Sequence, residues 1–171
     1  MYSGGFSIFW CDDGLDTGPI LLQKSVDLDP NETIDSLYTR FLYPEGITGV
    51  VEAVNLIDQG KAPKITQPEE GASYEPMLNK KELTRLNLAQ MTGREIHNFI
   101  RGCDKVPGAW ISLDGQAVKL YGSKMYRFPI PDNRTEISID GKTVEIIYID
   151  SDFIGLQMST QKQYFTPMDW F

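Results

Sequence analysis

Residues 12–19, DDGLDTGP, place three aspartates among two glycines and a proline between two apolar runs. A carboxylate held near others at a strand end has a raised proton affinity and can act as an acid or base near neutral pH. The same stretch could instead be a solvated turn whose aspartates make Asx-turn hydrogen bonds, and spacing alone leaves both interpretations open. The EF-hand register counted from Asp12 requires glycine and glutamate where the chain has Thr17 and Gln23, so we expect no metal here.

The negative charge lies in the first third of the chain. Residues 1–60 hold ten acidic residues against Lys24 and Arg40, so they carry the whole formal net charge of -8, and residues 61–171 balance to zero. A polyanion such as nucleic acid would be repelled by the first part and only weakly attracted by the second. We therefore expect no nucleic-acid partner.

Cysteine and histidine are scarce. Cys11, Cys103 and the single histidine, His97, are too few for a disulfide framework or a Cys/His zinc site. The sequence opens with no charged-then-apolar leader and contains no apolar run near the roughly 20 residues that span a bilayer. These features predict a cytoplasmic protein with no membrane partner; a mitochondrial location would need a leader that this sequence does not contain.

The periodicity of residues 1–60 predicts an α/β unit. Residues 6–11 and 20–25 have the pattern of strands. Helical spacing follows, with Asn31 or Thr33 as a cap for a first helix, and with a second helix from Pro44 to a stop at Gly60. The apolar positions are Ile34, Leu37, Tyr38, Phe41 and Leu42 in the first helix and Ile47, Val50, Val51, Val54 and Ile57 in the second. These helices need a sheet to cover.

The rest of the chain predicts a linker and a β domain. Residues 61–76 contain three prolines and no apolar period, as extended linkers do. Thr92 and Glu95 have capping-box spacing ahead of a short helix. Asp-Gly pairs at 114–115 and 140–141 each lie between two strand-like runs and predict hairpin turns. The runs are 109–113 with 117–121 and 136–139 with 143–149, which favours a small β-barrel or sandwich.

The run SIFWCDDGLDTGPILLQ resembles the folate-dependent formyltransferases, in which a strand ends in a D-x-G-L-D-x-G-P loop and the chain re-enters the sheet as I-L-x-Q. The helix pair, the GKAP…QPEEGASYEP linker and IHNFIRGCDKVPGAW are similar to that family too, most of all to its 10-formyltetrahydrofolate dehydrogenase hydrolase domains. The match covers about residues 4–122. It implies the last strands and two helices of a mononucleotide-binding domain in residues 1–60, a linker over 61–76, and an OB-like β-barrel domain in residues 77–171.

The resemblance also implies a site. In the family, the aspartate before x-G-P is catalytic and works with an asparagine and a histidine to move protons and to place water or an amine at the formyl carbon of 10-formyltetrahydrofolate. That position is Asp16 here. The loop backbone recognises the pterin ring in the family, and this role maps to Cys11, Asp12, Asp13, Gly14 and Leu15. Folate is thus the expected substrate, this segment binds no cofactor of its own, and NADP enters only with a dehydrogenase domain elsewhere.

The family's asparagine and histidine belong to an upstream N-x-H-x-S-L-L-P motif that this sequence does not contain. His97 is expected to be a half-buried helix residue and not a substitute, so formyl chemistry by this segment alone should be weak or absent. Unpaired strand edges and uncovered apolar side chains predict a partner, either the missing N-terminal half or a second copy joined through the sheet edge. Those side chains are Leu37, Phe41, Val50 and Val54.

Two other functions stay open. Methionyl-tRNA formyltransferases share the loop and the linker, but their C-terminal domain is normally basic, and the zero charge balance after residue 60 counts against that group. A non-catalytic interaction or regulatory fragment is favoured by the missing motif.

Overall fold

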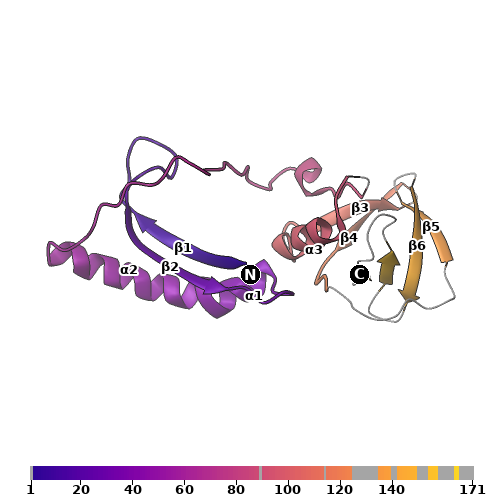
Figure 1. The fold of residues 1–171 in the computed structure, drawn as a ribbon, viewed down its shortest axis with the longest axis horizontal. Helices are drawn as coiled ribbons and strands as arrows, with labels where there is room; N and C mark the ends of the chain where they lie inside the picture. Colours follow the sequence, from indigo (N-terminus) through magenta and orange to yellow (C-terminus); the bar gives the residue numbers. More distant parts are fainter. Residues whose placement is uncertain are drawn as a thin grey trace. The chain divides into compact units, whose positions relative to one another are not determined.

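The computed structural model describes residues 2–88, 90–113, 115–124, 135–139, 142–149, 154–157 and 164–165. The chain divides into two compact units, one of residues 1–29 with 36–76 and the other of residues 30–35 with 77–171. Figure 1 traces both along the sequence. No helix among the described residues has the length and apolar character that crossing a bilayer requires.

The first unit is built on a two-stranded antiparallel sheet. Strands β1 (Ser3–Phe9) and β2 (Ile20–Asp27) pair in register from Ser3 opposite Asp27 to Phe9 opposite Ile20, with an irregularity after Ile8. Both predicted strands are confirmed, although the first begins and ends earlier than its apolar run suggests. The strands pair with each other, so the ten residues between them form the connecting loop.

The two predicted helices form one continuous helical run. Helix α1 (Ile34–Leu37) leads into a π-helical turn (Tyr38–Leu42) and then into α2 (Tyr43–Asp58). The prediction of a break before Pro44 is therefore wrong. Pro44 lacks an N–H, and the chain passes it by a wider turn in which the Tyr43 amide bonds to the Tyr38 carbonyl. The predicted stop at Gly60 is confirmed, because its φ of +67° and the Gly60 amide bond to Ile57 end the helix.

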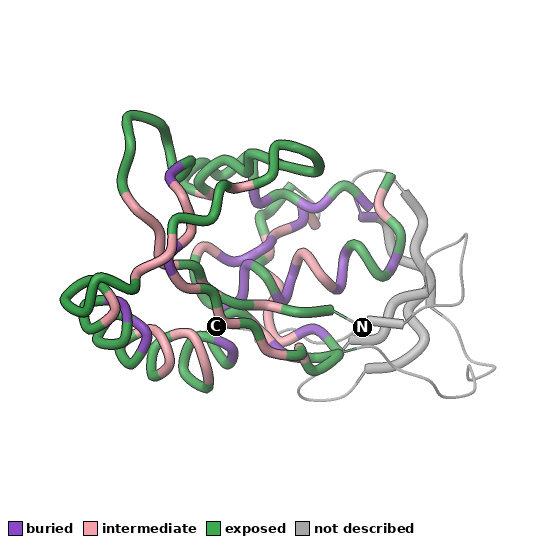
Figure 2. Tube along the Cα trace, turned by 60° about the vertical axis from the view of Figure 1, so that its left-hand side comes forward, coloured by how far each residue is buried: buried purple, intermediate pink, exposed green. Residues whose placement is uncertain are grey.

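Small residues of α2 face the sheet. Gly49 and Ala53 are buried, and a Cβ at Gly49 would press on the Phe6 ring of β1. The apolar stripe expected to cover the sheet lies instead on the exposed side of the helix, as the exposed colour of most of α2 in Figure 2 shows. Its members are Ile47, Val50, Val51, Val54 and Ile57, which are 46–58% exposed. Of the four side chains predicted to be uncovered, Leu37 is buried, Phe41 is half-buried, and Val50 and Val54 are exposed.

The second unit packs helix α3 (Gly93–Gly102) against a six-stranded antiparallel sheet of order β4-β3-β5-β6-β7-β8. The predicted capping box is confirmed, since the Thr92 hydroxyl accepts from the Glu95 amide and the Glu95 carboxylate accepts from the Thr92 amide. The strands are β3 (Ala109–Leu113), β4 (Gln116–Leu120), β5 (Thr135–Ile139), β6 (Lys142–Ile149), β7 (Ile154–Gln157) and β8 (Tyr164–Phe165).

The hairpin predicted around residue 115 is confirmed, with β3 paired to β4 from Ala109 opposite Leu120, and with Gly115 at a φ of +80°. Asp114 and the pair at 140–141 lie outside the described residues. Among the described strands no pairing joins β4 to β8, so an α/β chain with two small sheets is established and the OB-like barrel is not.

The core of the second unit lies between α3 and the sheet. Each aliphatic side chain fully buried there contributes about 1.5–3 kcal/mol to stability. Cys103 is 2% exposed, and burial raises the pKa of its thiol, so it packs as an apolar residue. The buried members of this core are Leu86, Leu88, Ile96, Ile100, Cys103, Ala109, Ile111 and Ile139.

The segment 30–35 joins the second unit through α3 and the turn after it. His97, 1% exposed, has its Nε2 2.8 Å from the Pro30 carbonyl and its Nδ1 2.9 Å from the Ser123 hydroxyl. A carbonyl only accepts, so Nε2 carries the proton and the Ser123 hydroxyl donates to Nδ1. Arg101 donates to the Glu32 carbonyl, and Lys105 pairs with Asp35 at 2.8 Å. His97 is thus more deeply buried than expected and has a structural role.

Acid should destabilise the second unit through His97. Burial is the main cause that lowers the pKa of His97 from its ordinary 6.5; the nearby charges of Arg101 and Arg94 add to it and the bond to Pro30 opposes it. Because the unfolded chain then binds the proton more readily, this contribution to stability is complete above about pH 6.5 and is lost as the pH falls below it.

Denaturant unfolding at about pH 7.5 and about pH 5.5, where carboxylates stay ionised, should show a larger loss of unfolding free energy in the wild type than in His97→Gln. The glutamine amide can still donate to the Pro30 carbonyl but does not titrate. An identical pH dependence in the two proteins would rule out His97 as the titrating group.

Candidate functional site

The acidic loop joins β1 to β2 over residues 10–19, and its base is closed by the Trp10 amide, which donates to the Pro19 carbonyl at 2.9 Å. Residues 11–17 are all exposed, whereas Gly18 is buried. A Cβ at Gly18 would overlap the Trp10 carbonyl, so only glycine lets the two ends of the loop approach this closely. The sequence thus forms a tight projection from the end of the sheet.

Asp12 shapes the loop from within. One oxygen of its carboxylate, Oδ1, accepts from the Gly14 amide at 3.0 Å and from the Thr17 hydroxyl at 2.8 Å. This is the Asx turn that one interpretation of the sequence predicted, and it is confirmed for this residue. Asp12 therefore holds the loop together through its side chain.

Asp16 has a different setting. Its φ of +57° puts it in the left-handed region, which is uncommon for a residue with a side chain although aspartate tolerates it better than most. Its side chain makes no hydrogen bond or ion pair with the described residues, and it is exposed to solvent. An unpaired carboxylate on a fixed backbone can hold a water molecule or accept a proton from one.

Gln67 fixes the backbone on both sides of this turn. Its side-chain amide nitrogen, Nε2, donates to the Asp16 carbonyl at 2.8 Å and to the Gly18 carbonyl at 2.7 Å. A single amide group therefore holds a strained residue and the glycine that follows two positions later. Strained backbone of this kind is often found at functional sites.

The neighbours of Gln67 also contact the base of the loop. The Trp10 indole donates to the Pro63 carbonyl at 2.8 Å, and the Lys64 ammonium lies 5.1 Å from the centre of that indole ring. Ile20 and Ile65 exchange backbone hydrogen bonds of 2.7 and 3.0 Å. Residues 63–67 were expected to belong to an extended linker, and their role as a support for the loop was missed. The one sequence feature that pointed to this supporting role was the QPEEG motif shared with the formyltransferases.

The other expected site residues share this loop. Cys11, Asp13, Gly14 and Leu15 are exposed, with Leu15 82% exposed, and the structure brings them together with Asp16 on one projection.

The sequence has one histidine, and both of its ring nitrogens are occupied by Ser123 and Pro30 within the second unit. Among the described residues no group of three or more His, Cys, Asp or Glu side chains could hold a metal ion.

Comparison with protein families gives two matches that together span most of the chain. The formyl transferase model matches residues 2–54, which include the loop, and the formyl transferase C-terminal domain model matches residues 79–160.

Curated relatives agree with these matches. The mitochondrial 10-formyltetrahydrofolate dehydrogenase of Homo sapiens is 58% identical over 127 residues, which are 74% of this chain and 14% of that protein. The cytosolic 10-formyltetrahydrofolate dehydrogenase of Xenopus laevis is 54% identical over 132 residues, 77% of this chain and 14% of that protein. The methionyl-tRNA formyltransferase of Rhizobium etli is 34% identical over 125 residues, 71% of this chain and 39% of that protein. The chain thus spans a small part of the length of the dehydrogenases that it resembles.

A solved structure supports the fold. HypX from Aquifex aeolicus, crystallised in complex with tetrahydrofolic acid, matches with a TM-score of 0.63 at 16% identity, covering 96% of this chain and 27% of that chain. The resemblance drawn from the sequence is confirmed by the family models and the relatives. The structural neighbour supports the α/β fold class but does not establish the OB-like barrel.

Replacing Gln67 with alanine should loosen the loop. It removes two hydrogen bonds, each worth about 1 kcal/mol net, so the amides that close the loop base should exchange with solvent about tenfold faster or more. The amides to follow by NMR hydrogen exchange are those of Trp10 and Ile20. Gln59→Ala is the matched control, because among the described residues the Gln59 side chain accepts one hydrogen bond, from the Lys61 ammonium, and contacts no part of the loop. Unchanged exchange at both amides in Gln67→Ala would show that the loop holds its shape without this side chain.

Proposed function

We propose, from the premise that this chain belongs to the formyl transferase family, that its acidic loop forms part of a site for 10-formyltetrahydrofolate at which the formyl group is released to water or transferred. The observation that carries the proposal is Asp16, whose carboxylate has no partner among the described residues while its backbone is fixed by Gln67. Asp12, by contrast, is paired within the loop and has a structural role. We infer that the Asp16 carboxylate acts on a group that is not part of the loop.

In this proposal the two halves of the loop have different tasks. The backbone of residues 11–15 offers amide and carbonyl groups to the edge of the flat pterin ring, and the exposed side chain of Leu15 gives it an apolar contact. Asp16 holds the attacking water and accepts a proton as that water adds to the formyl carbon. The bond from the formyl carbon to N10 then breaks, N10 takes up a proton, and formate and tetrahydrofolate leave.

Asp16 would not act alone in this reaction. The negative charge that develops on the formyl oxygen needs hydrogen-bond donors, and general acid–base catalysis of this kind commonly uses a histidine. His97 is occupied within the second unit, so we infer that these groups come from residues outside this chain. The two dehydrogenase relatives extend well beyond the matched part, and any NADP-dependent step would belong to such further residues.

We propose further that the second unit has an OB-like barrel fold, as its resemblance to the formyltransferase C-terminal domain implies. The chain works in the cytoplasm or in mitochondria, the two locations printed in the names of the dehydrogenase relatives.

A methionyl-tRNA formyltransferase is the second candidate, since the Rhizobium etli relative is one. The charge of this chain argues against it, because residues 61–171 carry no net positive charge with which to attract tRNA. An electrophoretic mobility shift with initiator tRNA would favour this candidate.

A non-catalytic role is the third candidate. It would be favoured if the chain bound no folate at concentrations below millimolar.

Asp16 and Asp13 can be separated by experiment. We expect the chain to bind tetrahydrofolate and 5-formyltetrahydrofolate with a dissociation constant below about 1 mM, measured by intrinsic fluorescence, and Asp16→Asn to bind within a few-fold of wild type. Catalysis is measured on the protein as it exists in the cell, with the residues that accompany this chain. In that protein, Asp16→Asn should lower the rate of formate release from 10-formyltetrahydrofolate about a hundredfold or more. Asp13→Asn is the matched control and should keep both properties, because only the backbone of residue 13 has a role in the proposed site and the exposed Asp13 side chain has none. Full formate release by Asp16→Asn would remove the catalytic role.

We also propose that the first unit docks against another polypeptide. Within the described part of the chain, β1 pairs with β2 alone, and the exposed side of α2 presents five β-branched side chains. Burying such a stripe is favourable by about 25 cal/mol per Å² of apolar surface, and an open strand edge offers unpaired hydrogen-bonding groups. The occupant is an N-terminal formyltransferase half or a second copy of this chain.

Size-exclusion chromatography of the chain, with an apolar-surface dye, tests this docking. We expect either an oligomer or strong dye binding, and Val54→Glu should reduce whichever is seen because it puts a charge in the apolar stripe. Asn55→Glu is the control, since Asn55 is an exposed polar residue of the same helix. A monomer that binds no dye would exclude the partner surface.

A further inference from the structure

We propose that the second unit carries a binding site for a small anionic ligand with an apolar portion, in the cavity between the 3-10 helix of residues Lys81–Thr84 and the β3–β4 hairpin. This site is formed within the second unit and does not rest on the function proposed for the acidic loop.

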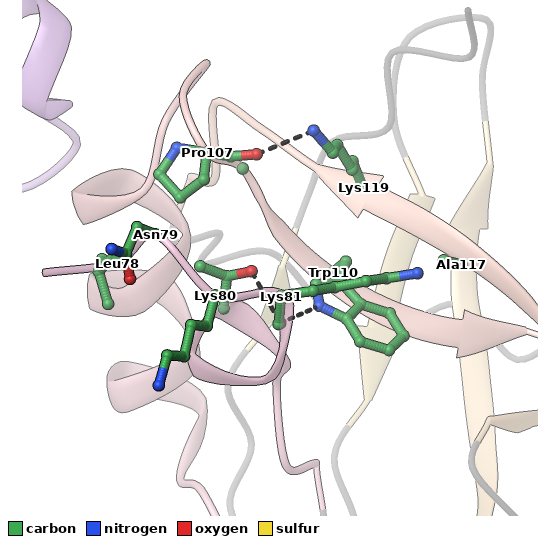
Figure 3. A pocket seen from close by; sticks show the side chains of 10 residues that line it. Leu78, Asn79, Lys80, Lys81, Pro107, Trp110, Ala117 and Lys119 are labelled. Atoms are coloured by element: carbon green, nitrogen blue, oxygen red, sulfur yellow. Dashed lines mark hydrogen bonds between the residues drawn. The ribbon is translucent and has the colours of Figure 1, made fainter.

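The cavity has the size and chemistry of a small-molecule site. Its volume is about 310 Å³, at the lower end of the range for ligand pockets. Its described lining combines apolar and cationic side chains and includes no acidic residue; Figure 3 shows the arrangement. The apolar and cationic residues of this lining include Leu78, Lys80, Lys81, Pro107, Trp110 and Lys119.

The lysines of this cavity differ from the ion-paired lysines elsewhere. Lys24 lies 3.2 Å from Glu52, and Lys105 lies 2.8 Å from Asp35. By contrast, Lys80, Lys81 and Lys119 contact no carboxylate in the described part of the chain. Unpaired cations around one concavity, on a chain whose formal net charge is -8, create a local positive potential that favours anions there over the rest of the surface.

The walls of the cavity are held by specific contacts. The Trp110 indole donates to the Lys81 carbonyl at 2.8 Å, while the Lys81 ammonium lies 4.7 Å from the centre of that ring. The Lys119 ammonium donates to the Pro107 carbonyl at 2.9 Å and keeps two further N–H groups for a ligand. Gly108 has a φ of +84° and lies against the Tyr121 ring, so the backbone here leaves no room for a side chain.

These contacts assign roles within the site. Lys81 is anchored over Trp110 and Lys119 beside Pro107, so their ammonium groups lie on different sides of the cavity (Figure 3). Either group can hold a carboxylate or a phosphate at the rim while the apolar part of the ligand contacts the indole or the proline. In Figure 3 Lys80 extends away from Trp110, which suits a second charge at the edge of a larger anion. A ligand with a charged group on a small aromatic body fits this distribution.

Phenyl phosphate and phthalate are the probes, and benzamide is the uncharged control. In two-dimensional 15N NMR of the full chain, we expect both anions to move the Trp110 indole and Gly108 amide signals, each with a measurable dissociation constant, and benzamide to move them much less. A preference for phenyl phosphate identifies a phosphate site, and a preference for phthalate a carboxylate site. Raising the salt concentration should weaken binding because the charges are at the rim.

The neutral variants Lys119→Met and Lys81→Met should each weaken binding by about fivefold or more, since a charge-assisted hydrogen bond is lost. Lys119→Arg should retain most of the affinity, which separates loss of charge from loss of fold. Lys64→Met is the matched control, because Lys64 also lies beside a tryptophan but in the first unit. The proposal is overturned if neither anion moves the two signals at about 10 mM, or if Lys64→Met weakens binding as much as Lys119→Met.

Discussion

Two hydrogen bonds from one amide group determine the candidate site. Gln67 Nε2 holds the carbonyls of Asp16 and Gly18, and so keeps Asp16 in a left-handed conformation with its carboxylate in solvent. The two residues are about fifty positions apart in the sequence, so the loop acquires its shape only when the segment after α2 returns to the sheet. The paired bonds of Ile20 and Ile65 are the backbone part of the same contact. The loop and the segment 63–67 therefore act as one structural element of the first unit.

The local signals in the sequence were sufficient for most secondary structure. The capping box at Thr92, the glycine stop at Gly60 and the hairpin around Gly115 are each specified by a few adjacent residues, and all three are found. The continuous helix was not foreseen, because a proline normally suggests a boundary and a π-helical turn has no clear pattern. The buried side of α2 was also assigned wrongly. Periodicity identified the apolar stripe, but the helix lies so close to the Phe6 ring that the side facing the sheet needs a small residue, Gly49.

The candidate site was predictable only in part. The sequence and its family resemblance indicated which residues form the loop, and the Asx-turn pattern correctly anticipated the bonds of Asp12. The role of Gln67 could not be derived, since it depends on a contact between distant segments that no local spacing encodes. The same holds for His97, whose bonds to Pro30 and Ser123 join three separate parts of the chain. Charge patterning located the acidic third of the sequence but did not reveal that unpaired lysines gather at one cavity.

The proposed function depends on contact between the loop around Asp16 and a folate. Amide chemical shifts of the chain during titration with tetrahydrofolate test it most directly, because they report the position of binding whether or not any formyl group is released. We expect the largest shift changes on residues 11–16, with smaller ones at Gln67 and Ile20. Changes centred on the Trp110 cavity, or none on the loop when tetrahydrofolate is in large excess, would contradict it.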